Sequence, residues 1–374
     1  MDLSLKSSLS ETIEASDNYF LSSTPNGMIY RPVSTITLDA VGRTPKIKLR
    51  LNTHFSYYKY LGPGSDELTV TDGTQKGVVF NIDRAGKFTK DLTNFNVSWR
   101  QFDAGPEQLA ETGQETVTGE TTTFAAGGGV TKALSARDTV SFTAGGTSSE
   151  FTSSTASNYV NWSAAGTWRH QLNLTNELIN LVDFSWNIRS NDSETKFWRM
   201  MTGIDSKLTP RSNFRGNIGA GLFQVEGSSD NLVSLTTFNS VFNGSSELGV
   251  GLLWDAMLSY KIDRTTNASL NAGQSISPDV AGRYSERRSI GVNVTRDINH
   301  LSSINFSSNF TNFTSISSEY DLLTVSVGYN YKLAKEWNSS LSYTFRERFS
   351  EINPASSSSV MLTFRYDATI LPEK

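Results

Sequence analysis

Long segments of alternating apolar and polar residues are the feature that most constrains the fold of this chain. In "EWNSSLSYTFRERF" (336–349), one column of alternate residues is apolar and aromatic, from Trp337 to Phe345, and the other is polar and cationic, from Asn338 to Arg348. Successive side chains of a β-strand point to opposite faces, so the segment predicts a strand with one apolar and one hydrated face. The same alternation recurs in "KIKLRLNTHFSYY" (46–58), "LTNFNVSWRQF" (92–102) and "SSINFSSNF" (302–310).

The length of these segments and their connections indicate a membrane barrel. The segments run to roughly 10 to 14 residues, whereas strands of soluble proteins are usually about 5 or 6 residues long and tilted membrane strands need about 9 to 11. Short connections such as "GRTPK" (42–46) alternate with longer ones rich in Gly, Ser, Asp and Asn. The chain therefore predicts an all-β fold, a transmembrane antiparallel up-and-down β-barrel of about 18 strands (about 16 to 20), with both termini on the short-turn side. We expect residues 1–374 to form this single domain.

The aromatic column is expected to face lipid. A soluble β-sandwich array, an adhesin stalk or a β-helix would leave columns of Trp, Tyr and Phe in water, where they promote aggregation, and the pattern is not broken by interdomain linkers. Strand parity predicts that six large aromatic side chains face outward: Trp99, Trp162, Trp186, Trp198, Trp254 and Tyr343.

Composition excludes several classes of function. The chain has no cysteine, three histidines and a net charge of −4. Disulfides, thiolate metal sites and cysteine catalysis are therefore excluded, and the scattered histidines offer no nucleophile–base cluster. We expect no enzyme, no cofactor, no metal and no nucleic-acid partner. Met1 leads directly into the first strand without a signal peptide, so the protein is either cytoplasmic or has lost a leader, and the barrel favours the bacterial outer membrane.

The polar column carries a set of cations that strand parity directs inward. They are Lys46, Lys48, Arg50, Arg100, Arg189, Arg199, Arg215, Arg287, Arg346 and Arg348, against the carboxylates Asp39, Asp83, Asp183, Asp205 and Asp255. One interpretation is salt bridging between neighbouring strands. The other is a positive lumen, because a barrel of this size is wide enough for an aqueous channel and rings of Arg and Lys select anions.

A second set of cations stands at the short turns: Arg43, Lys90, Lys132, Arg169, Lys207, Lys261, Arg296 and Lys332. The preferred interpretation is anchoring, in which long cationic side chains reach lipid phosphates at the periplasmic interface. The alternative is a cationic funnel on the periplasmic rim of the channel.

The longest outer connection, residues 226–247, is the candidate gating loop. Its apolar residues, among them Leu232, Leu235, Phe238 and Phe242, would be costly to leave in water. It either extends the wall as a longer hairpin or folds into the lumen and narrows it.

The chain resembles a family of outer-membrane porin-type barrels found in exopolysaccharide-synthesis operons. The likeness lies in the opening "SETIEASDNYFL" (10–21) and in repeated turns such as "KDLTNFNVSWRQF" (90–102) and "KLTPRSNFRGNIG" (207–219), and it extends along the whole chain. It departs from outer-membrane barrels at the end, where "VMLTFRYDATILPEK" continues past Tyr366.

This resemblance implies export of a secreted, often acidic polysaccharide, beside a periplasmic polysaccharide-export protein. Export through a cationic lumen is thus the leading hypothesis for function. The alternative is a passive anion-preferring porin for small solutes, and a third class is a structural or adhesive barrel. The sequence leaves the oligomeric state open.

Overall fold

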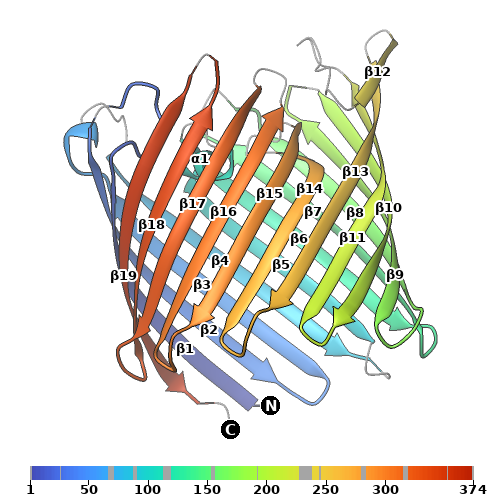
Figure 1. Cartoon of the computed structure of the whole chain (residues 1–374), viewed down its shortest axis with the longest axis horizontal. Helices are drawn as coiled ribbons and strands as arrows, with labels where there is room; N and C mark the ends of the chain where they lie inside the picture. The colour runs from blue at the N-terminus through green and yellow to red at the C-terminus, as the bar shows by residue number, and fades with distance from the viewer. Residues whose placement is uncertain are drawn as a thin grey trace.

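The computed structural model is a closed antiparallel barrel (Figure 1). It describes residues 2–25, 27–65, 71–86, 91–112, 119–152, 156–191, 193–226, 238–243, 246–278, 284–314, 319–351 and 353–372. The wall has 18 strands, which confirms the predicted fold and strand number. No described helix is long and apolar enough to cross a bilayer.

The wall strands follow one another along the chain. The first half is β1 (Asp2–Ser16), β2 (Ile29–Arg43), β3 (Ile47–Lys59), β4 (Asp72–Ala85), β5 (Leu92–Asp103), β6 (Glu120–Ala133), β7 (Asp138–Phe151), β8 (Tyr159–Gln171) and β9 (Asn176–Arg189). The second half is β10 (Glu194–Thr209), β11 (Ser212–Glu226), β13 (Ser246–Lys261), β14 (Thr266–Pro278), β15 (Tyr284–Asp297), β16 (Ser302–Thr314), β17 (Glu319–Lys332), β18 (Trp337–Phe349) and β19 (Ala355–Leu371). Three short elements lie in the connections: η1 (Pro63–Ser65), α1 (Ala104–Thr112) and β12 (Phe238–Asn243).

The barrel closes between its first and last strands. β1 pairs with β19 from Ser16–Ser359 to Leu5–Leu371, so the last strand runs past Tyr366 to its end at Leu371. Both termini lie at the end of the barrel that carries the short turns (Figure 1), as the sequence predicts.

The inner face is identified by residues that meet across the lumen. Arg31 of β2, Gln75 of β4, Thr344 of β18 and Ser357 of β19 border one cavity together with α1. Because neighbouring residues in register share a face, these positions assign the inner face of every strand through the pairing registers.

The six aromatic side chains predicted to face outward all lie on the opposite, outer face. Large apolar side chains accompany them there and are exposed, such as Ile13, Phe142 and Ile218. An exposed apolar and aromatic exterior is stable only against lipid, so the structure supports the location in the bacterial outer membrane.

Candidate functional site

The connection between β1 and β2, residues 17–28, folds into the barrel over its described residues 17–25 and 27–28. Leu21 is only 2% exposed and adopts a φ of 49°, in the left-handed region. Asn18 fixes the segment: its side-chain amide donates to the carbonyl oxygens of Ser22 (2.7 Å) and Ser356 (2.9 Å), and its Oδ1 accepts from the Ser22 amide (2.9 Å). The apolar "YFL" at 19–21 is therefore held inside the barrel rather than above it.

Helix α1, in the connection between β5 and β6, meets this segment. The Asp103 carboxylate accepts from the Gly105 amide (3.3 Å) and so caps the first turn. Nine residues are too few for a stable isolated helix, so α1 depends on packing. Leu109, 3% exposed, packs with Leu21 and with inner-face residues of the distant strands β16 and β17, namely Phe313, Tyr320 and Leu322. The helix therefore reaches from β5 to the far wall.

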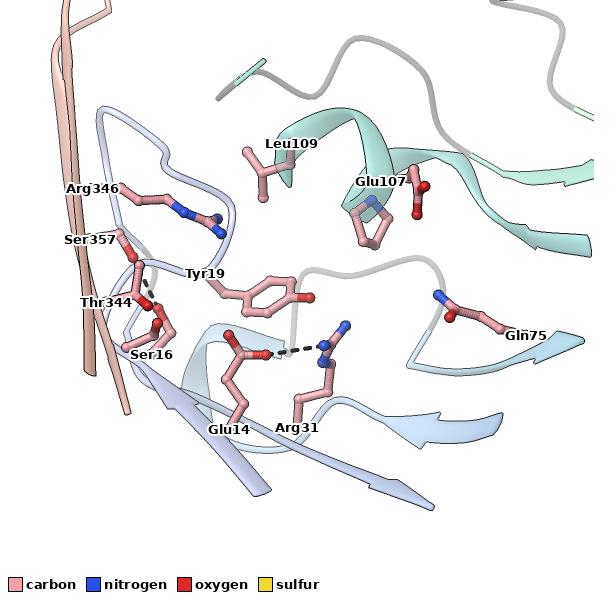
Figure 2. A pocket seen from close by; sticks show the side chains of 12 residues that line it. Glu14, Ser16, Tyr19, Arg31, Gln75, Glu107, Leu109, Thr344, Arg346 and Ser357 are labelled. Carbon is pink, nitrogen blue, oxygen red and sulfur yellow. Dashed lines mark hydrogen bonds and ion pairs between the residues drawn. The ribbon is translucent and has the colours of Figure 1, made fainter. Parts of the chain in front are cut away.

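Between α1, Tyr19 and the wall lies a cavity of about 270 Å³, which we call the eyelet (Figure 2). Its charged groups are mixed in sign. Arg31 pairs with Glu14 (3.1 Å) and lies 5.2 Å above the Tyr19 ring. Burial raises the pKa of the Tyr19 hydroxyl well above its usual value, so the ring stays neutral beside Arg31.

Arg346 of β18 lines the eyelet from the other side (Figure 2). Among the described residues its side chain has no ion-pair or hydrogen-bond partner, and its neighbours in the cavity are the hydroxyl-bearing residues Ser16, Thr344, Ser357 and Ser359. An uncommitted guanidinium surrounded by hydroxyl groups is a site where a passing anion can bind weakly and be released.

The register places nearly all of the predicted lumen cations on the inner face. These are Lys48, Arg50, Arg100, Arg189, Arg199, Arg215, Arg287, Arg346 and Arg348. Lys46 differs, because it lies in the turn before β3 rather than on a strand.

Carboxylates offset part of this charge. Arg50 pairs with Asp39 (2.7 Å), Arg199 with Asp183 (2.6 Å), Arg215 with Asp205 (3.6 Å) and Arg100 with Glu107 of α1 (3.3 Å). These four arginines thus form the ion pairs that the salt-bridge interpretation expects. Other carboxylates that the sequence analysis did not include also lie on the lumen side, among them Glu14, Glu107, Glu177, Asp297 and Asp367.

The short-turn cations divide between the two faces. Lys132 and Arg296 lie on the outer face, where anchoring in lipid fits. The register gives the others inner-face positions, which does not fit anchoring and leaves the funnel as the remaining hypothesis for them: Arg43, Arg169, Lys207, Lys261 and Lys332. Lys90 lies outside the described residues.

The candidate gating loop is described only in part. Leu232 and Leu235 lie outside the described residues. Phe238 and Phe242 belong to β12, whose backbone pairs with β13 from Phe238–Gly251 to Asn243–Ser246. Residues 238–243 thus follow the hairpin alternative, and the described constriction is built by residues 17–28 and α1 instead. Two features of the sequence could have indicated these inward segments: the apolar "YFL" at 19–21 and the helix start at 103–106.

One part of the inner face is apolar rather than hydrated. Phe197, Met201, Phe223 and Leu253 on β10, β11 and β13 form a buried cluster with Ile276 of β14. The β13–β14 ladder ends at Trp254–Gln274. Beyond this pair, as far as the described residues show, β14 continues to pair with β15 alone. Because Ile276 lies on the outer face of β14, the upper β14–β15 hairpin packs against the inside of the neighbouring wall.

Within the described residues, no group of three or more His, Cys, Asp or Glu could hold a metal ion. A wide barrel with a hydrated, charged and constricted lumen is an architecture found in outer-membrane channels.

Among the comparisons with known proteins, only the comparison with solved structures found similar proteins, and it supports the fold. No protein-family model matches the chain, and no curated protein matches it. The structure is similar to the crystal structures of OccK2 (OpdF) from Pseudomonas aeruginosa, with a TM-score of 0.54, 10% identity and coverage of 99% of this chain and 98% of that one. It is also similar to OccAB1 from Acinetobacter baumannii, with a TM-score of 0.53, 8% identity and coverage of 98% and 97%. These are outer-membrane porin structures. They support the porin part of the resemblance inferred from sequence, but not the exopolysaccharide-operon family.

Proposed function

We propose that this protein is a diffusion channel for small anionic solutes in the bacterial outer membrane. The observation that carries the proposal is the eyelet, in which Arg346 faces a cavity of about 270 Å³ without a carboxylate partner among the described residues. An anion can exchange its water for the guanidinium and the surrounding hydroxyl groups there, whereas a cation meets carboxylates already paired with Arg31 and Arg100.

Polysaccharide export, the leading hypothesis from sequence, has less support. Residues 17–28 and α1 cross the lumen, and Leu109 joins them to the far wall. A polymer conduit would need both elements to move aside. The fold comparisons also favour small-solute channels, and they offer no support for a periplasmic export partner.

A complex of a similar structure supports an anionic solute. OccK2 has been crystallised with glucuronate, at a TM-score of 0.54 and 10% identity to this chain. Glucuronate combines a carboxylate with several hydroxyl groups, which is the chemistry that Arg346 and its hydroxyl-bearing neighbours can contact. We therefore take small hydroxylated carboxylates as the solutes to test.

Liposome swelling provides the test. Liposomes containing the purified barrel should swell faster in glucuronate than in glucosamine, an equally sized cationic sugar. Arg346→Gln should remove most of that preference. Arg296→Gln, which removes a charge from the outer face, is the matched control and should leave it unchanged. Equal rates for the two sugars in the unaltered protein would refute the proposal.

A further inference from the structure

The lumen has two chemically different walls. On β1 to β4, the inner face is charged, with Lys6 next to Asp39 and Lys48 next to Asp83. On β14 to β17, three successive rows of inner-face residues contain no Asp, Glu, Lys or Arg. The rows, read from β14 to β17, are Asn271–Gly291–Asn309–Thr324, Ser269–Asn293–Ser307–Ser326 and Asn267–Thr295–Asn305–Gly328. We call this surface the amide wall.

The amide wall has unused hydrogen-bonding capacity. Each Asn side chain has two N–H donors and an oxygen with two acceptor positions. Within the part of the chain that the structure describes, few of these are used: Asn293 donates to Asn271 Oδ1 at 3.5 Å, Asn309 donates to the Thr311 hydroxyl at 2.7 Å, and Asn305 Oδ1 accepts from Asn330 at 3.4 Å. Asn293 and Asn309 are exposed to the lumen, so their remaining donors and acceptors face water.

Two glycines shape the surface. A methyl group built on Gly291 would lie 2.9 Å from the Oδ1 atoms of both Asn271 and Asn309. The two amides therefore lean over Gly291 from either side, and a side chain there would displace them. Gly328 has the same relation to Asn305, whose Oδ1 would lie 2.5 Å from such a methyl group. The amides thus lie along the wall, where they can form hydrogen bonds with a flat solute that lies against it.

From these observations we infer that the amide wall is a binding surface for the hydroxyl groups of sugars, whether or not the sugar is charged. Vicinal hydroxyl groups both donate and accept, which matches amides that do the same, and neither partner needs a formal charge. The top row continues to Arg346 on β18, so the wall begins at the eyelet. This inference rests on the proposed diffusion channel: the eyelet would select the charge of a solute, and the amide wall its hydroxyl groups.

The test uses maltotriose, a neutral sugar, as a blocker of ion current through the barrel in a planar bilayer. Maltotriose should reduce the current in a saturable way. The double variant Asn271→Ala/Asn309→Ala should raise the half-blocking concentration by about fivefold for each amide that contacts the sugar, because a hydrogen bond contributes about 1 kcal/mol. Asn94→Ala/Asn96→Ala, on the inner face of β5, is the matched control and should not change it.

The outcomes separate the inference from the function on which it rests. No ion current from folded barrels would refute the channel itself. Ion current without maltotriose block, or block that both double variants weaken equally, would overturn the amide wall alone. If Asn271→Ala/Asn309→Ala fails to fold, Asn293→Ala/Asn305→Ala removes amides from the same wall and must give the same result.

Discussion

Docking of α1 against the far wall should control how often the channel opens wide. Leu109 is 3% exposed and packs in a buried cluster with Leu21 and Phe313. Leu109→Ala removes this contact and leaves a cavity, which costs about 3 kcal/mol for a buried leucine. Because about 1.4 kcal/mol is a factor of ten, the docked state should lose roughly a hundredfold in its equilibrium with the undocked state.

Single-channel recording measures this directly. Leu109→Ala should show large, brief conductance increases roughly a hundredfold more often than the unaltered protein, if the change acts mainly on docking. The resistance of the barrel to heat should change little, since the wall ladders do not involve Leu109. Leu174→Ala, at a turn position 90% exposed, is the matched control and should leave both properties unchanged. Unaltered opening frequency in a folded Leu109→Ala channel would refute the role of α1 as part of the constriction.

Three further predictions concern other parts of the constriction. Burial raises the pKa of the Tyr19 hydroxyl above its ordinary value of 10.0. The neutral ring therefore stabilises the inward segment fully below pH 10.0, and this stabilisation is lost as the pH rises through the raised pKa. Conductance should therefore be constant at neutral pH and rise in strong alkali, and Tyr19→Phe, which cannot ionise, should lack the alkaline rise attributable to this residue. Deleting residues 230–243 should leave conductance nearly unchanged, because β12 pairs with β13 as a hairpin. A severalfold rise would show that this loop narrows the lumen. Leu253→Ala, at a site 1% exposed, should lower the free energy of unfolding in detergent by about 3 kcal/mol, and a change below about 1 kcal/mol would show that the apolar inner cluster is loosely packed.

The local alternation of apolar and polar residues was enough to predict the barrel wall and the direction of its side chains. Trp162 and Tyr343 face outward as their parity requires, because strand geometry alone decides the face of a side chain. The same rule directed Arg50 and Arg199 inward correctly. It could not show that Asp39 and Asp183 neutralise them, since those contacts depend on the register between neighbouring strands.

The constriction was harder to predict because it depends on long-range packing. Leu21 and Leu109 are far apart in sequence and meet only across the closed barrel. A local signal did exist at the apolar inner cluster: Phe197 and Met201 stand in the inner column beside Trp198 in the outer one, which indicates a strand covered on both faces. The hairpin that covers them, at Ile276, could not be identified from that pattern alone.

The most direct test of an anion-preferring channel is the reversal potential of the unaltered protein in a planar bilayer under a potassium chloride gradient. At low salt the potential should have the sign of chloride selectivity. It should fall toward zero as the salt approaches about 1 M, where the Debye length shrinks to about 3 Å and the eyelet charges are screened. A reversal potential of the opposite sign at low salt, which means potassium selectivity, would contradict the proposed function.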